Sequence, residues 1–381
     1  MQNFWQELPQ PFFVLAPMEA VTDTVFRHVV QAAAAPDLYF SEFTNATGWA
    51  HAGDRAIGRR LIKTDDEQPI VAQLWGVDPA AMAKLAKHCA QLGYDGIDIN
   101  MGCPDASAVR SGGGAGMIRT PELAAQMIAA AKTSGLPVSV KTRLGYSQTN
   151  EYPDWLAHLL GQDIVALTVH LRTKKEMSKV DAHWDLMPAI KTLRDQIAPQ
   201  TLLVGNGDVR DRAHGLELVT QTGIDGIMIG RGIFSNPFAF EHTEPLETVQ
   251  KHTKEELLSL LKLHLDLFEQ FHGGVKARAS RGLAVSDPLG ANINWSYLAP
   301  AGKAESDPTS PREARLAPKL HTDKMPDDQT FQPAFEPLKR FFKIYIRDFP
   351  EAASIRERLM HCHNLSEVRV ILDHTFAERT Y

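Results

Sequence analysis

The segment Ile70–Cys103, IVAQLWGVDPAAMAKLAKHCAQLGYDGIDINMGC, contains one repeat of the architecture that we predict for the chain. It opens with an apolar run, and a helical pattern follows from Pro79 to Leu92, with proline where a first turn favours it. A second apolar run, 96–102, ends in polar and sulfur-bearing residues. This order predicts a strand, a helix and a further strand.

The same alternation extends from Pro11 to about Phe240. Eight apolar runs are expected to form strands: FFVLAP, LYFSEF, IVAQLWG, GIDINMG, VSVKTR, IVALTVH, LLVGNGD and GIMIGRG. Further helices are expected over Pro121–Ser134 and Asp211–Thr222. Eight strands alternating with helices predict an α/β protein with a (β/α)8 TIM barrel.

The last positions of these runs support the barrel more strongly than their number. They carry Met18, Glu42, Gln73, Asn100 with Cys103, Lys141 with Arg143, His170, Asn206 with Asp208, and Arg231. In a parallel barrel all strand C-termini open on one face, so these side chains would meet there and form an active site. A doubly wound open sheet also collects ligands at strand ends, but it is less favoured because all eight runs end this way.

The composition indicates a cytoplasmic protein without a membrane anchor. The chain has 381 residues, 44% hydrophobic and 23% charged, and three widely spaced cysteines. Such spacing favours a reducing compartment over a disulfide framework, and the first residues lack the pattern of a signal peptide. The net charge of -6 argues against a general nucleic-acid coat but leaves room for a basic patch. We expect a monomer.

The pattern changes to helices beyond Leu246. Apolar residues recur at helical spacing over Lys254–Phe271 and Phe335–Ile346, whereas 273–333 is polar and rich in proline. We expect that segment to be a long mobile insertion. The sequence therefore predicts a barrel domain over 1–245 and a helical domain over 246–381.

Two glycine-bearing turns favour a phosphorylated cofactor. GNGD (205–208) and GRG (230–232) follow the last two runs, where barrels commonly hold a phosphate, and Arg231 could add a bidentate contact. The GGGAG cluster (112–116) fits neither the dinucleotide fingerprint nor the phosphate loop. We interpret it as backbone that passes close to a ligand, or as a flexible turn.

Lys141 ends an otherwise apolar strand, so its charge requires an anion or an electron-rich ring. A flavin would supply such a partner, and a salt bridge to Asp98 or Asp208 is the alternative. His170 alone would more often be a satisfied core histidine, but its place at a strand end makes it a candidate site residue.

Cys103 is a candidate general acid, because a free thiol with a pKa of about 8.5 is mostly protonated near neutral pH. Cys89, in the helix Pro79–Leu92, and Cys362, in the terminal helix, are expected to be buried as small apolar residues. The HCH sequence at 361–363 does not predict a zinc site, because residues two apart on a helix point to different sides.

A basic stripe is expected near the C-terminus. Lys339, Arg340, Lys343 and Arg347 would share one helical face, opposite Phe341, Phe342, Ile344 and Tyr345. A solvated face is the default interpretation, and the stripe would also suit an RNA backbone.

Six of these stretches together resemble the tRNA-dihydrouridine synthases, in order and at suitable spacing. They are LAPMEAVTDTVFR, DINMGCPDASAVRSGGGAGMI, VSVKTRLG, LTVHLRTKKE, GNGD and GIMIGRGIFSNPF. The resemblance covers about Pro11–Phe240 well, the terminal helices more loosely, and the insertion not at all.

The resemblance implies an FMN-bearing barrel and a helical RNA-binding domain, with NADPH as the reductant and tRNA, or another structured RNA, as the partner. Hydride would pass from the flavin to C6 of a flipped-out uracil, and Cys103 would donate the proton to C5. By the resemblance, the residues that would contact the flavin ring are Pro17, Met18, Gln73, Lys141 and His170. Those that would hold its phosphate region are Asn206, Gly207, Asp208, Gly230 and Arg231. Asn100 and Arg143 would face the substrate nucleotide.

One position departs from the family pattern: Ala106 stands where members commonly have lysine. A positive contact near the substrate would be lost, and Lys276, Arg278 and Arg281 of the insertion could compensate. Two alternatives remain open: an FMN barrel oxidoreductase acting on a small molecule, and a non-catalytic RNA-binding paralogue.

Overall fold

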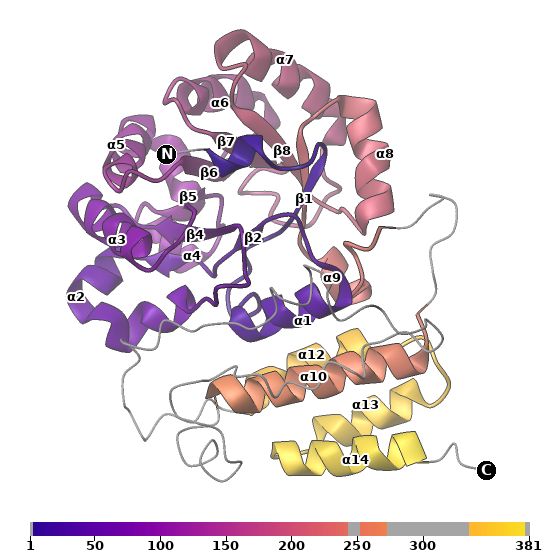
Figure 1. Ribbon diagram of the computed structural model, residues 1–381. Helices are drawn as coiled ribbons and strands as arrows, with labels where there is room; N and C mark the ends of the chain where they lie inside the picture. The colour runs from indigo at the N-terminus through magenta and orange to yellow at the C-terminus, as the bar shows by residue number, and fades with distance from the viewer. Residues whose placement is uncertain (1–2, 243–251, 273–334, 378–381) are drawn as a thin grey trace. The chain divides into compact units, whose positions relative to one another are not determined.

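The computed structural model describes residues 3–242, 252–272 and 335–377 (Figure 1). The predicted insertion and the predicted boundary between residues 245 and 246 lie outside these ranges, as do Lys276, Arg278 and Arg281. The described residues form two compact units. The first comprises 1–24, 36–63 and 67–232, and the second comprises 25–35, 64–66 and 233–381, each in its described part.

The first unit is built on a sheet of parallel strands. They are β1 (Phe12–Leu15), β2 (Tyr39–Phe40), β4 (Ile70–Trp75), β5 (Gly96–Met101), β6 (Val138–Arg143), β7 (Ala166–His170), β8 (Leu202–Asn206) and β9 (Gly226–Ile229). The order is β1-β9-β8-β7-β6-β5-β4-β2, and a parallel bridge between Val14 and Leu38 links its two ends. The predicted TIM barrel is thus confirmed.

A short strand that the sequence did not predict, β3 (Thr44–Asn45), pairs with the end of β4. It continues the chain direction of β2 after a three-residue interruption that contains Glu42. Asn45 also caps the following helix, because its side chain accepts a hydrogen bond from the backbone N–H of Gly48. The run LYFSEF is therefore a shorter strand than its apolar residues suggest.

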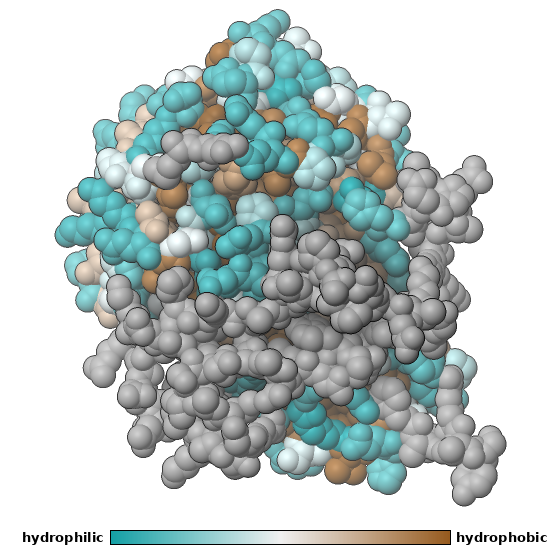
Figure 2. Space-filling view, viewed as in Figure 1, coloured by the Kyte–Doolittle hydropathy of each residue, from teal (hydrophilic) through white to brown (hydrophobic). Residues whose placement is uncertain are grey.

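Helices surround the strands of this unit (Figure 1). They include α2 (Ala46–Ile57), α3 (Pro79–Gln91), α4 (Ala106–Arg110), α5 (Pro121–Lys132), α6 (Tyr152–Leu160), α7 (Met187–Ile197) and α8 (Arg212–Thr222). Hydrophilic residues cover much of their outer surface in Figure 2. The predicted helices agree with α3, α5 and α8 to within two residues at each end.

Helix α3 shows why the local sequence specifies these elements. Asp78 caps its first turn by accepting hydrogen bonds from Ala80 and Ala81, and Pro79 occupies a first-turn position that needs no N–H. Its apolar residues recur at helical spacing and are buried, and Cys89 is among them as predicted. The helix therefore packs one apolar face inward.

The second unit is helical. It contains most of α1 (Thr24–Ala34) and of α9 (Gly232–Ser235), and the whole of α10 (Lys254–His272), α12 (Lys339–Tyr345), α13 (Ala352–Met360) and α14 (Leu365–Ala377). Phe26 of α1 packs its ring against His264 and Phe341, and His264 hydrogen-bonds to the Tyr345 hydroxyl at 2.8 Å. No helix in the described part of the chain has both the length and the apolarity needed to cross a membrane.

Two predictions in this unit were wrong in detail. Arg347 lies beyond the end of α12 at Tyr345, because the backbone leaves the helical conformation at Ile346, with φ -96° and ψ 80°. Its guanidinium binds the carbonyls of Phe234 and Ser235 and the Asp348 carboxylate instead of joining the basic stripe. Cys362 is buried as expected, but it lies between α13 and α14 rather than in a helix.

The other face of the predicted stripe is confirmed: Phe341, Phe342, Ile344 and Tyr345 are all buried. On the polar face, Lys339 forms an ion pair with Glu336 at 2.8 Å, and the Lys343 ammonium lies 5.9 Å from the Phe234 ring centroid. Three basic residues therefore share α12, with Arg340 exposed between them.

Candidate functional site

The strand register places the predicted site residues beside one another at the C-terminal ends of neighbouring strands. Asn100 of β5 is paired with Lys141 of β6. Two positions further along, Arg143 is paired with His170 of β7, and His170 with Asn206 of β8. Polar side chains from four consecutive strands thus line one end of the barrel, which is where TIM barrels carry their active sites.

Cys103 follows β5 and is partly exposed at this end. The Asn100 side chain accepts hydrogen bonds from the backbone N–H of Cys103 at 2.9 Å and of Gly102 at 3.1 Å. Burial raises the pKa of the Cys103 thiol above its ordinary value, although nearby Lys141 and Arg143 oppose the shift. The thiol therefore keeps its proton at neutral pH.

The glycine cluster 112–116 packs directly against Cys103. A side chain at Gly114 would place its Cβ 2.6 Å from the Cys103 carbonyl oxygen, and Gly114 has φ +53°. The next residue, Ala115, donates its N–H to the same oxygen at 2.9 Å. The glycine is needed for this close approach, which holds the cysteine loop in place.

Lys141 forms no hydrogen bond or ion pair with any residue that the structure describes. Neither predicted salt bridge is present: Asp98 accepts from Gln73 and Ser139 at 2.7 Å each, and Asp208 pairs with two arginines. Burial, with Arg143 nearby, lowers the pKa of Lys141 to about 8. Burial likewise raises the pKa of Asp98 to about 6.

Gln73 and Asn100 belong to one buried hydrogen-bond chain. The Asn100 amide donates to Gln73 Oε1 at 3.0 Å, and the Gln73 amide donates in turn to Asp98. Gln73 is fully buried, and Asn100 is 6% exposed. This chain fixes the orientation of Asn100, and thereby of the backbone that carries Cys103.

Arg143 joins two loops. Its Nε donates to the Gly102 carbonyl at 2.8 Å, and its Nη1 donates to the carbonyls of Thr173 and Met177 at 3.1 and 3.0 Å. The first carbonyl lies beside Cys103, and the other two lie in the loop after β7. Burial lowers the pKa of Arg143 only to about 10, so the guanidinium stays charged.

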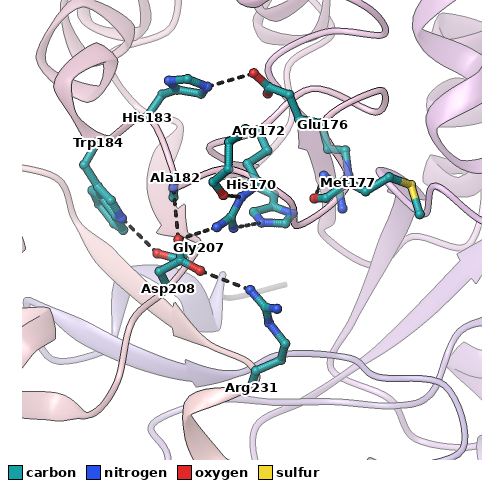
Figure 3. Close-up of polar contacts among 12 residues, drawn as sticks. His170, Arg172, Glu176, Met177, Ala182, His183, Trp184, Gly207, Asp208 and Arg231 are labelled. Carbon is teal, nitrogen blue, oxygen red and sulfur yellow. Dashed lines mark hydrogen bonds and ion pairs between the residues drawn. The ribbon is translucent and has the colours of Figure 1, made fainter.

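A polar network surrounds His170 and the GNGD turn (Figure 3). Asp208 accepts hydrogen bonds from Arg172, from Arg231 at 3.0 Å and from the backbone N–H of Ala182 at 2.9 Å. Burial alone would raise the pKa of Asp208, but these donors hold it below its ordinary value. Arg231 is 61% exposed and is the outermost member of the network.

His170 is a neutral hydrogen-bond acceptor in this network. Its Nε2 lies 3.2 Å from Nη1 of Arg172, and a guanidinium can only donate. Burial, with four surrounding arginine and lysine charges, lowers the pKa of His170 well below its ordinary value. The imidazole therefore carries its single proton on Nδ1, which leaves one N–H available to a ligand.

The remaining predicted residues take different places. Asn206 uses its amide to donate to the Met228 carbonyl at 2.9 Å, and Gly207, with φ +130°, accepts from the Trp184 indole at 2.8 Å. Pro17 is buried, and Met18 and Gly230 are partly exposed. The backbone of Met18 is fixed by the Thr22 hydroxyl, at 2.9 Å from its N–H.

Comparison with known proteins identifies the family of the chain. A family model described as "Dihydrouridine synthase (Dus)" matches residues 14–283. The chain belongs to the dihydrouridine synthase family. It is 48% identical over 373 residues to "Probable tRNA-dihydrouridine synthase 2" of Bacillus subtilis, covering 98% of this chain and 96% of that protein. Proteins named "Probable tRNA-dihydrouridine synthase" from Staphylococcus epidermidis and Staphylococcus aureus are 48% and 47% identical, over 97% and 95% of their own lengths.

Sequence reasoning missed one residue at this end of the dihydrouridine synthase barrel and left a second without a specific role. Arg172 lies within the quoted LTVHLRTKKE stretch, but only the fold shows that it contacts both His170 and Asp208. Glu42 is one of the strand-end residues expected at the active-site face, and the sequence assigns it no specific contact. It is 4% exposed and accepts from the Ala20 N–H at 2.5 Å, and burial, with Asp23 and Glu19 nearby, raises its pKa to about 7.

Ala106, the expected departure from the family pattern, is exposed at the start of α4. Asp105 precedes it and caps the helix by accepting from Ser107 and Ala108. A cation at position 106 would lie three residues from Cys103. The described part of this loop offers Arg110, at the end of α4, as its basic residue.

Proposed function

We propose that this protein is an FMN-dependent tRNA-dihydrouridine synthase that uses NADPH to reduce a specific uridine of tRNA to 5,6-dihydrouridine. The observation that carries the proposal is the partly exposed Cys103 thiol, protonated at neutral pH and held at the same barrel end as Lys141 and His170. Family membership and the names of the relatives support the reaction and the substrate.

The residues present fit a flavin. Lys141 is a cation at a strand end without a partner in the described chain, and burying it alone would be costly. An electron-rich ring or an anionic group would relieve that cost. His170 adds one N–H, and the exposed guanidinium of Arg231 adds a donor suited to a phosphate.

Bound FMN, once reduced by NADPH, would supply the hydride that reaches C6 of the uracil. Lys141, His170, Gln73, Pro17 and Met18 would hold its ring system. The turns with Asn206, Gly207, Asp208, Gly230 and Arg231 would hold its phosphate region.

The chain's own contribution to catalysis is a positioned proton. Hydride addition at C6 leaves C5 in need of a proton, and the Cys103 Sγ holds one because burial raises the pKa of the thiol. Asn100 and the Gly114 turn fix the backbone on both sides of this cysteine. Asn100 and Arg143 would face the nucleotide, and the Nη2 atom of Arg143 is the part of its guanidinium that neither loop occupies.

A reaction with unmodified tRNA tests the proposal. The purified protein, NADPH and a tRNA transcript should yield one uridine that is heavier by two hydrogen atoms in mass spectrometry, and the protein should show flavin absorption. A colourless protein that binds tRNA would favour the non-catalytic paralogue. NADPH oxidation with a small molecule that needs no RNA, and with no change in the tRNA, would favour the other flavin oxidoreductases.

A further inference from the structure

We propose that the barrel unit itself carries an RNA-backbone contact, formed by Arg119, Tyr146, Lys174 and Lys175. We call these four residues the Tyr146 surface. The inference rests on the proposed function and names a part of the molecule that would hold the tRNA beside Cys103.

The first observation is that two cations of this surface lie at one aromatic ring and form no ion pair with a carboxylate of the described residues. The Arg119 guanidinium lies 4.2 Å and the Lys174 ammonium 5.1 Å from the Tyr146 ring centroid. Within the part of the chain that the structure describes, neither these two nor Lys175 forms an ion pair with a carboxylate. Other cations of this unit do, such as Lys132 with Asp163 and Lys191 with Asp195.

The second observation is that hydrogen bonds fix the backbone at Tyr146, Lys174 and Lys175. The Glu151 carboxylate accepts hydrogen bonds from three successive backbone N–H groups, those of Tyr146, Ser147 and Gln148, at 2.6 to 3.0 Å. The backbone N–H groups of Lys174 and Lys175 donate to Gly145 and Tyr146, at 2.9 Å each. Little conformational freedom of the backbone would be lost on binding, which favours affinity.

The third observation is the position of the surface relative to Cys103. Tyr146 follows β6 and Lys174 follows β7, so both lie on loops at the C-terminal end of the barrel. Arg143 binds the carbonyl of Thr173, which precedes Lys174, and the carbonyl of Gly102, which precedes Cys103. One side chain thus connects the Tyr146 surface to the loop of the proposed acid.

These features fit the phosphodiester chain of an RNA. Unpaired lysines and an arginine neutralise phosphates whatever the base sequence, and they release counterions as they do so. In a chain with net charge -6, the two cations at the Tyr146 ring, with Lys175 next in the sequence, are where a polyanion would be attracted. The cation–π contacts with Tyr146 hold two of the charges in place without neutralising them.

The test compares two charge-matched double variants of the flavin-loaded, full-length protein. R119Q/K174Q removes two charges from the Tyr146 surface, and K84Q/K87Q removes two exposed lysines from the outer side of α3. The probe is an unmodified tRNA transcript, with Kd measured at several salt concentrations. We expect R119Q/K174Q to weaken binding about tenfold and to reduce the slope of log K against log salt by about 1 to 2. K84Q/K87Q should bind as the wild type does.

A pair of Tyr146 variants checks the role of the ring. Y146F keeps the aromatic face and should retain affinity, whereas Y146L should weaken binding because both cations lose their support. Equal affinity of R119Q/K174Q and K84Q/K87Q, with the wild type binding and reducing tRNA, would overturn the Tyr146 surface alone. A wild-type protein that does not bind tRNA would overturn the proposed substrate together with this surface.

Discussion

Arg172 donates a hydrogen bond from Nη1 to Nε2 of His170 over 3.2 Å. The same arginine binds Asp208 through Nη2 and the Val180 carbonyl through Nε. Because all three sides of the guanidinium are engaged, its plane is fixed and the imidazole can only accept at Nε2. The protonation state of a proposed flavin-contacting residue is thus set by a neighbour that need not touch the flavin.

Replacing Arg172 should change the tautomer of His170. In Arg172→Met we expect a mixture of Nδ1–H and Nε2–H forms, and a loss of about 1 to 3 kcal/mol of stability because Asp208 loses a charged donor. Nitrogen NMR of the labelled imidazole reports the tautomer without any turnover. Arg172→Lys serves as the comparison, since it keeps the charge but cannot reach all three acceptors. An unchanged His170 spectrum in both variants would contradict the assigned role.

Replacing Cys103 should remove the proton donor and leave the flavin site intact. We expect Cys103→Ala to lower the rate of tRNA reduction by about 10²- to 10⁴-fold, with flavin content and flavin reduction by NADPH unchanged. Cys89→Ala is the matched control, because that thiol is fully buried in α3. It should cost about 1 kcal/mol of stability and leave turnover unaffected. A fully active Cys103→Ala protein would exclude the thiol as the acid.

Two glycines of the cluster offer a matched comparison of backbone strain and close approach. Both have positive φ, but a Cβ at Gly112 would meet only Val77 Cγ1 at 3.6 Å, whereas one at Gly114 would clash with the Cys103 carbonyl. We expect Gly112→Ala to cost about 1 to 2 kcal/mol and Gly114→Ala about 3 kcal/mol or more. Denaturant unfolding measures both. Only Gly114→Ala should also slow the reduction of tRNA, since it displaces the cysteine loop.

The Lys141 charge should make the flavin-free protein more stable as pH rises. Burial lowers the folded-state pKa from 10.5 to about 8, so between those values the unfolded chain binds more protons than the folded protein. The free energy of unfolding therefore increases from about pH 8 to 10.5. Below pH 8 this group lowers it by a constant amount. Lys141→Met should remove this dependence, stabilise the flavin-free protein at pH 7 and weaken flavin binding. Urea titrations across this pH range test the two effects on stability. Fluorescence quenching of FMN measures flavin binding.

The sequence predicted the barrel well because each strand is short, apolar and followed by a polar residue. Even so, the pattern overestimated the run LYFSEF, which forms only a two-residue β2 before Glu42 turns away to accept from Ala20. It also predicted that the basic stripe extends to Arg347, because the helical spacing of residues continues past Tyr345, whereas the helical backbone ends there. Local sequence does not predict the hydrogen bonds to the backbone that end these elements.

The sequence was sufficient to predict which strand-end residues form the candidate site. It was not sufficient to predict which of them form hydrogen bonds or ion pairs with one another. Lys141 was recognised as a charge in need of a ligand, and the structure leaves it without a protein partner in the described chain. Arg172 was overlooked because its function depends on the loop after β7 returning to Asp208, a contact between residues 36 positions apart. Long-range pairing of this kind has no period in the sequence.

Arg143 couples two loops mechanically at the C-terminal end of the barrel. Its planar guanidinium binds the carbonyl of the peptide group before Cys103 through Nε, and the Met177 carbonyl through Nη1. If the proposed RNA docks on the outer segment, a displacement there would reach the loop of Cys103 through one side chain. Docking of the RNA and alignment of the thiol proton would then occur together. The thiol would be less well aligned for an isolated nucleotide than for an intact folded RNA.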